Sequence, residues 1–216
     1  MSLVSEQISS SSIFNIRPLD ENDKRQVLSL LLNSFFPDEP ITQYLQITET
    51  SEFAKTIIDD CLHDRCSFVA LNTETNVIVG ICLNKIKHKN DRNETAHSDE
   101  KLGRLFQIFA DLHETLNIFN ALNADTLLHV FVISVDGRAR RHKLSSRLIA
   151  KSIEYAQELQ ITGAFAEATS LVSRQCFEQQ QFNVFGRLTY KNDNSKCLPT
   201  LNNEDNNQCY LVARKF

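Results

Sequence analysis

The segment that most constrains the fold runs from Leu127 to Val135 and is apolar except for His129 and Ser134. Such a run is typical of a central strand that is buried on both faces of a sheet. A turn follows, and residues 144–159 then carry apolar side chains at the spacing of a helix. Residues 164–168 indicate a further strand. Strand, helix and strand in this order predict an α/β fold, with helices on both faces of a mixed central sheet.

The remaining segments fit this architecture. Asp20 is expected to cap a helix that contains residues 27–32, and Pro37 and Pro40 are expected to stop it. Gly163 is expected to end the helix over residues 144–159. Together these elements predict a single domain over 13–216, after a flexible N-terminal tail at 1–12. Further strands are predicted at 14–19, 67–71, 77–86, 182–190 and 208–216, helices at 49–62, 102–119 and 170–180, and loops at 87–99 and 191–207.

Composition narrows the classes of function. Hydrophobic residues make up 42% and charged residues 23% of the chain, enough apolar material for a sizeable core. The net charge of −4 argues against a surface devoted to nucleic acid or to an acidic membrane. The sequence lacks a run of 18 apolar residues and an apolar signal segment at its start, so we expect a cytoplasmic protein that does not bind membranes. We also expect a monomer. The cysteines form no C-x-x-C pair and are interpreted as reduced thiols, without a metal site; they are Cys61, Cys66, Cys82, Cys176, Cys197 and Cys209.

Residues 136–143, here called the basic turn, concentrate cations directly before the helix expected to start at Leu144. A helix N-terminus carries roughly half a positive charge, so each cation there is unfavourable by about 0.3–1 kcal/mol. A bound anion would remove this conflict, because free backbone N–H groups and arginines bind phosphate. The turn follows a buried strand, which is where α/β folds place ligands. The alternatives are a solvated turn or a basic localisation signal.

Strand, basic turn and helix resemble the coenzyme-A-binding motif of the GNAT superfamily of N-acyltransferases, with matches at Val135, Arg140, Leu144 and Leu148. Three further segments strengthen the resemblance. Residues 35–41 (FFPDEPI) and 116–119 (LNIF) are similar to stretches of the insect arylalkylamine N-acetyltransferases, and residues 178–182 (EQQQF) to their Glu-Lys-Leu-Gly-Phe junction. The resemblance extends over residues 14–216. It implies the GNAT acyltransferase fold.

The resemblance also implies an enzyme that transfers an acetyl or longer acyl group from acyl-CoA to a small arylalkylamine such as dopamine, tyramine, octopamine or serotonin. It places the co-substrate acetyl-CoA, without a metal, against two nearby stretches: Ile133, Ser134 and Val135, and Arg140, Arg141, His142, Lys143, Leu144, Ser145 and Ser146.

The chain departs from the superfamily at several positions of these motifs. Lys143 and Ser145 stand where the coenzyme loop has small residues, Gln181 replaces the junction glycine, and Ala139 replaces an aromatic residue. Glycine in the coenzyme loop permits close backbone approach to the pyrophosphate. A catalytically impaired GNAT-fold binding protein is therefore the alternative to an active enzyme.

Acylation of an amine needs a general base, because amines of this class are protonated near neutral pH. The resemblance gives this role to Glu39, which is fixed by Pro40, and maps two supporting hydroxyls onto Thr169 and Ser173. Such a hydroxyl could protonate the departing thiolate. The alternatives are that Glu39 belongs to an exposed acidic turn with Asp38, and that Ser173 caps a helix.

The other candidates are weaker. We interpret His129 as a core histidine with a satisfied hydrogen bond and His113 as a packing residue. Cys82 and Cys176 lack an adjacent basic partner in the sequence and are interpreted as inert thiols. A third hypothesis, a nucleic-acid or phosphoprotein binder that uses residues 138–147, is disfavoured by the acidic net charge and by the lack of interleaved aromatic residues.

Overall fold

The computed structural model describes residues 13–91, 99–114, 116–190 and 207–216, and the predicted tail at 1–12 lies outside them. The described residues form one seven-stranded sheet in the order β1-β2-β3-β4-β5-β7-β6. Neighbours β4 and β5 are parallel and the other neighbouring pairs are antiparallel, which confirms the predicted mixed sheet. The strands are β1 (Phe14–Pro18), β2 (Phe68–Asn72), β3 (Val77–His88), β4 (Thr126–Val135), β5 (Gly163–Ala168), β6 (Asn183–Thr189) and β7 (Gln208–Lys215).

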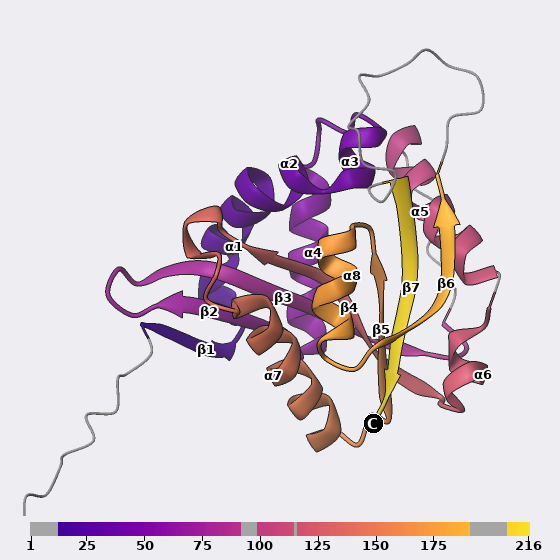
Figure 1. Ribbon diagram of the computed structural model, residues 1–216. Helices are drawn as coiled ribbons and strands as arrows, with labels where there is room; N and C mark the ends of the chain where they lie inside the picture. The colour runs from indigo at the N-terminus through magenta and orange to yellow at the C-terminus, as the bar shows by residue number, and fades with distance from the viewer. Residues whose placement is uncertain (1–12, 92–98, 115, 191–206) are drawn as a thin grey trace, which may run out of the picture.

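Helices cover both faces of the sheet. Figure 1 shows α7 and α8 in front of it, and α1 and α4 pack on the opposite face of β3. None of the helices that the structure describes is long and apolar enough to cross a membrane. The helices are α1 (Lys24–Leu30), α2 (Phe36–Asp38), α3 (Pro40–Tyr44), α4 (Ser51–Asp64), α5 (Glu100–Glu114), α6 (Ile118–Leu122), α7 (Leu144–Glu158) and α8 (Leu171–Glu178).

The apolar run of β4 is explained by burial on both sides. Leu128 and Val130 belong to the core cluster beneath α7, which also contains Leu148. Leu127 belongs to the cluster on the other face, together with Ile118 of α6. Burying a leucine or valine side chain contributes about 1.5–3 kcal/mol, so β4 anchors both layers to the sheet.

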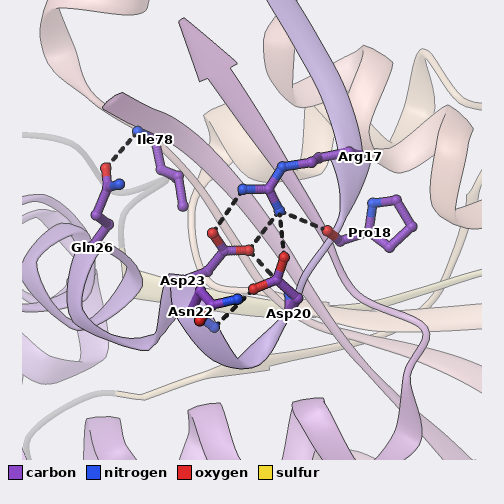
Figure 2. Close-up of polar contacts among 7 residues, drawn as sticks. All are labelled: Arg17, Pro18, Asp20, Asn22, Asp23, Gln26 and Ile78. Atoms are coloured by element: carbon purple, nitrogen blue, oxygen red, sulfur yellow. Dashed lines mark hydrogen bonds and ion pairs between the residues drawn. The ribbon is translucent and has the colours of Figure 1, made fainter. Parts of the chain in front are cut away.

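The end of β1 is locked onto the first helices by a compact polar cluster (Figure 2). The carboxylate of Asp23 accepts the backbone N–H of Asp20 at 3.0 Å and two hydrogen bonds from Arg17 at 2.6 and 2.7 Å. Burial raises the pKa of the Asp23 carboxyl, but these hydrogen bonds outweigh it and the pKa lies below its ordinary value. The backbone N–H of Ile78 in turn donates to Gln26 at 2.9 Å. These contacts fix the start of the helical segment that leads to Glu39.

The predicted stop at Pro37 is wrong. After α1 the chain passes through a π-helical turn (Leu31–Phe35) into α2, which contains Pro37. A proline in the first turn of a helix lacks only an N–H that has no intrahelical acceptor, so it is tolerated there. The helical structure breaks instead at Glu39 (φ −79°, ψ 118°), where the ring of Pro40 disfavours a helical conformation of the preceding residue.

The predicted amphipathic helix over 102–119 is two helices. α5 ends at Glu114, and α6 begins at Ile118 after an extended residue, Asn117 (φ −77°, ψ 103°). The side chain of Asn117 accepts the N–H of Asn120 at 3.0 Å and so caps α6. The apolar spacing continues across the break, which is why the sequence indicated one helix.

Gly163 does not end α7, which stops at Glu158; it is the first residue of β5. A Cβ at Gly163 would lie 2.9 Å from the carbonyl oxygen of Arg214 on β7. The position therefore needs glycine for close strand approach rather than for a helix end. β3 also continues to His88, so the predicted loop at 87–99 begins later; its residues 92–98, and 191–206 of the other predicted loop, lie outside the described residues.

Candidate active site

β4 and β5 pair over a short stretch and then separate. Their register pairs are Leu128 with Ala164 and His129 with Phe165. Beyond these pairs the two arrows diverge in Figure 1, and β4 remains paired with β3 as far as Val135. The edge of β4 that faces away from β3 is thus open along the stretch that contains the predicted coenzyme residues 133–135. An extended ligand with amide groups can hydrogen-bond to such an edge.

A β-bulge lies in the middle of this open stretch. Val130 pairs with Asn84 and Val132 with Leu83, so Phe131 is an extra residue on β4. Bulges re-aim side chains and backbone groups and are frequent beside active sites. Here the bulge turns the backbone of β4 at the point where the strands part.

The basic turn leads into α7 without a side-chain cap. Lys143 occupies the N-cap position and makes no capping hydrogen bond. The first N–H groups of a helix have no intrahelical acceptor, so this turn of α7 can bind an anion. Arg138 is engaged locally, since its guanidinium donates to the Asp136 carboxylate at 2.9 and 3.0 Å. This interaction holds the pKa of the Asp136 carboxyl at about 2.

The backbone keeps the glycine conformation where the sequence has lost the glycines. Lys143 has φ 55° and Gln181 has φ 63°, both in the left-handed region, and Arg141 of the basic turn has φ 72°. A residue with a Cβ pays roughly 1–2 kcal/mol there. Lys143 and Gln181 thus add local strain in a conformation that favours glycine. Ala139 is buried at 4% exposure, and the His142 ring packs edge-on against Phe14 at 4.9 Å.

A contact between two distant segments brings the predicted base towards the basic turn. Arg140 donates to Asp38 at 2.6 Å, although the two residues are 102 positions apart. Both side chains are exposed, so the pair adds little stability. Its importance is positional, because Asp38 immediately precedes Glu39.

Glu39 is buried, with 8% exposure, whereas Asp38 is exposed. Its carboxylate accepts the backbone N–H groups of Ile41 at 3.1 Å and Thr42 at 2.5 Å, and the Thr42 hydroxyl at 2.7 Å. A carboxylate has about four acceptor positions, so roughly one remains for a further donor. Glu39 is therefore the N-cap of α3 and a rigidly held anion, and not part of an exposed turn.

The predicted hydroxyls lie after the end of β5, beyond the last pair that this strand forms with β4. Ser173 and Ser170 form a capping box at the start of α8: Ser173 N–H donates to Ser170 Oγ at 3.0 Å, and Ser170 N–H to Ser173 Oγ at 3.2 Å. The hydroxyl of Ser173 also donates to the carbonyl oxygen of Ser170 at 2.9 Å. Ser173 therefore takes part in capping α8, which was the expected alternative to a catalytic role. Thr169, half-buried, directly follows β5.

The structure assembles a cluster that sequence reasoning missed, formed by His113 of α5, His129 of β4 and Glu167 of β5. The Nε2 atoms of the two histidines lie 2.6 Å from separate oxygens of the Glu167 carboxylate. The His129 ring stacks on Phe165 at 4.4 Å. The only local signal was a polar residue inside each of two apolar strands. Among the residues that the structure describes, no group of His, Cys, Asp and Glu side chains is arranged to hold a metal ion.

Cys209 of β7 connects this cluster with Glu39 electrostatically. Burial raises the pKa of its thiol, and the charges of Glu167 and Glu39 raise it further. Tyr190 is also affected, because burial and then the charge of Glu39 raise the pKa of its phenol. Burial likewise raises the pKa of the thiols of Cys82 and Cys176, in keeping with inert cysteines. The two carboxylates thus act on one buried patch of the sheet.

Comparison with known proteins identifies structures that have a similar fold. No family model matches the sequence. The structure of arylalkylamine N-acetyltransferase 2 from Aedes aegypti aligns with a TM-score of 0.80 at 20% identity, covering 94% of this chain and 98% of that chain. Mosquito arylalkylamine N-acetyltransferase like 5b aligns at 0.81 and 16% identity over 94% and 100% of the two chains. Drosophila melanogaster polyamine N-acetyltransferase, which forms N-acetylagmatine, aligns at 0.80 and 17% identity over 94% and 100%.

These similarities confirm the predicted fold: the chain has the mixed sheet and flanking helices of the GNAT N-acetyltransferases, and it resembles the insect arylalkylamine enzymes in structure. The similar proteins differ in the amine that their names specify. The fold alone therefore does not identify the acceptor amine, which has to be inferred from the residues of this chain.

Proposed function

We propose that this chain is an N-acyltransferase that transfers an acetyl or longer acyl group from acyl-CoA to a small arylalkylamine, such as dopamine, tyramine, octopamine or serotonin. The observation that carries the proposal is the contact of Arg140 with Asp38 at 2.6 Å. It joins the anion-binding start of α7 to the segment that holds a buried carboxylate, Glu39. A site for a pyrophosphate and a site for a base are thereby adjacent.

The coenzyme fits the residues that are present. The uncapped first turn of α7, with Ser145 and Ser146, and Arg140 and Arg141 of the basic turn would hold the pyrophosphate. The open edge of β4 over residues 133–135 would accept the amide groups of the pantetheine arm. Bound there, the coenzyme supplies an activated acyl thioester.

Glu39 is proposed as the general base. An arylalkylammonium ion must lose a proton before its nitrogen can attack a thioester, and Glu39 has a free acceptor position in a buried setting. The neutral nitrogen attacks the thioester carbonyl, the carbon–sulfur bond breaks, and the nitrogen loses its second proton as the amide forms. The departing thiolate takes up one proton, and Thr169 is the hydroxyl proposed to pass this proton from the nitrogen to the sulfur, because the hydroxyl of Ser173 is engaged in the cap of α8.

An aromatic acceptor is favoured by the surroundings of this segment. Phe36 packs against Phe53 at 5.9 Å, and Phe53 against Phe106 at 5.8 Å. Tyr44, five residues after Glu39, lies 5.2 Å from Tyr190. Aromatic rings next to an anion suit a ligand that carries both an aryl group and an ammonium group.

The test is an acyl-transfer assay over a panel of amines, combined with thermal shift by acetyl-CoA. Glu39→Gln should lower turnover of tyramine or dopamine by roughly a hundredfold. The rise in melting temperature on adding acetyl-CoA should remain, because the coenzyme binds other residues. Glu52→Gln makes the same chemical change on an exposed side chain of α4 and should leave turnover near wild type.

Each adverse outcome has a distinct meaning. Wild-type protein that is stabilised by acetyl-CoA but acylates no amine in the panel would support the impaired binding protein. Transfer to polyamines alone would show that the acceptor is a polyamine and not an arylalkylamine. Glu39→Gln with near-normal turnover would remove Glu39 from the mechanism.

A further inference from the structure

A buried polar cluster lies between α7 and the sheet, outside the residues assigned to the site. It consists of Asn84 of β3, Ser152 of α7, Cys66 and Cys82, and is here called the Asn84 cluster. Asn84 and both cysteines are 0% exposed, and Ser152 is 1% exposed. The cluster lies among the apolar side chains of the core beneath α7. Polar groups in such a place cost free energy unless each of them has a hydrogen-bond partner.

The polar groups of the Asn84 side chain all have partners. Its Nδ2 donates to the carbonyl oxygen of Cys66 at 2.7 Å and to Ser152 Oγ at 2.9 Å. Its Oδ1 accepts the thiol of Cys82 at 3.3 Å. The hydroxyl of Ser152 donates in turn to the carbonyl oxygen of Leu148, one turn earlier in α7, at 3.0 Å. A buried network that is satisfied in this way is directional and favours one arrangement of the elements that it joins.

The Asn84 cluster fixes the position of α7 along β3. Burial of leucine and isoleucine side chains is non-directional, so apolar contacts alone do not specify this position. A buried asparagine sets the register of packed helices in coiled coils for the same reason. A separate contact limits the distance between α7 and the sheet, because a Cβ at Gly80 would lie 3.2 Å from Leu148 Cδ1. Gly80 therefore permits the close approach of α7, and the hydrogen bonds of Asn84 select its position along the strand.

Asn84 also lies beside the bulge of β4. It pairs with Val130, the residue directly before the extra residue Phe131. Its backbone N–H donates to Ser67 Oγ at 2.9 Å, which anchors this part of β3 to the segment that leads into β2. The bulged part of β4 and the helix α7 are therefore both held by one residue of β3.

The proposed coenzyme site has two halves that belong to these two elements. The open edge of β4 over residues 133–135 would bind the pantetheine arm, and the first turn of α7 would bind the pyrophosphate. Ser152 follows Leu144, the first residue of α7, by about 12 Å along the helix axis at the ordinary rise per residue. Because the hydrogen-bonded backbone keeps this rise fixed, a shift of α7 at Ser152 moves its first turn relative to β4.

We propose that Asn84 and Ser152 are positioning residues that set the spacing between the two halves of the coenzyme site, so that one CoA molecule can bind both halves at once. Both side chains are buried and act through β4 and α7, not by contact with the ligand. A ligand that binds both halves depends on their spacing, whereas a ligand that binds one half does not. This inference rests on the coenzyme site of the proposed function.

The experiment measures the binding of three ligands to the double variant Asn84→Leu/Ser152→Ala, in which apolar side chains replace both polar partners. CoA contains both the pyrophosphate and the pantetheine arm, ADP contains only the pyrophosphate, and pantetheine contains neither phosphate. We expect Kd for CoA, measured by calorimetric titration, to rise about tenfold, the loss typical of one hydrogen bond to a charged group. Kd for ADP and for pantetheine, measured by displacement of labelled CoA, should change less than about threefold.

Ile153→Val is the matched control for a loss of stability. Ile153 follows Ser152 on α7 and is buried in the same core, but it makes no contribution to the Asn84 cluster. The variant should lower the melting temperature by about 1–6 °C and leave Kd for CoA unchanged.

Three results would overturn the positioning role while the proposed function stands. They are an unchanged Kd for CoA in the double variant, equal losses of affinity for all three ligands, and a loss for Ile153→Val as large as that for the double variant. If the double variant does not fold, Ser152→Ala alone decides, because Asn84 keeps its hydrogen bond to the Cys66 carbonyl oxygen. Its Kd for CoA should then rise about threefold or more with ADP and pantetheine unaffected, and an unchanged Kd for CoA would overturn the role.

The wild-type protein separates the two proposals. If it binds CoA but acylates no amine, acyl transfer is overturned and the Kd values above still decide the positioning role. If it binds no CoA, both the proposed function and the positioning role are overturned.

Discussion

Lys143 offers a direct measure of the strain stored at the start of α7. It is an exposed N-cap residue with φ 55° and makes no capping hydrogen bond. A residue with a Cβ pays roughly 1–2 kcal/mol in this conformation, and glycine gives back about 0.5–1 kcal/mol through its greater freedom in the unfolded chain. Lys143→Gly should therefore be more stable than Lys143→Ala by about 0.5–1 kcal/mol. The alanine variant is the matched control, because it removes the same charge and keeps the Cβ.

The assay is thermal unfolding of both variants by calorimetry in the same buffer. For a domain of this size 1 kcal/mol corresponds to roughly 2–4 °C, so the glycine variant should melt about 1–4 °C above the alanine variant. Equal melting temperatures, or a more stable alanine variant, would refute the reasoning. Lys143 would then not be held in the left-handed conformation. A phosphate site at the start of α7 that depends on this backbone conformation would no longer be supported.

Three further predictions concern the coenzyme, the sheet and acid stability. Affinity for acetyl-CoA, measured by calorimetric titration, should fall as ionic strength rises from low to physiological, because salt screens the attraction of the basic turn; a constant affinity would contradict this. Gly163→Ala should lower the free energy of unfolding in urea by roughly 1–3 kcal/mol, because its Cβ would lie 2.9 Å from the Arg214 carbonyl oxygen, whereas Gly137→Ala, with nothing within 4 Å, should have a much smaller effect. Because the pKa of Glu167 is lowered in the folded state, its contribution to stability is present above its ordinary pKa of 4.5 and is lost as pH falls. Glu167→Gln should therefore weaken the decrease of the free energy of unfolding in urea at acidic pH. An unchanged decrease would show that Glu167 does not cause it.

The sequence by itself determined the order of elements and several local devices. The apolar run of β4, the helical spacing of α7 and the cap at Asp20 depend on residues within a few positions of one another, where spacing and side-chain chemistry act directly. The same local rules explain the errors. Apolar spacing ran through the break before α6, and a proline that looked like a stop was tolerated in a first turn.

Only the tertiary structure decided how the site is assembled. Strand order places β4 beside β5, and this brings Glu167 to His129 across 38 positions and to His113 across 54. The contact of Arg140 with Asp38 spans 102 positions in the same way. The burial of Glu39 likewise follows from which elements pack together. Periodicity and capping report on neighbours along the chain, whereas the environment of an ionisable group is set by residues that only the folded sheet brings near, so its chemistry could not be predicted from local pattern.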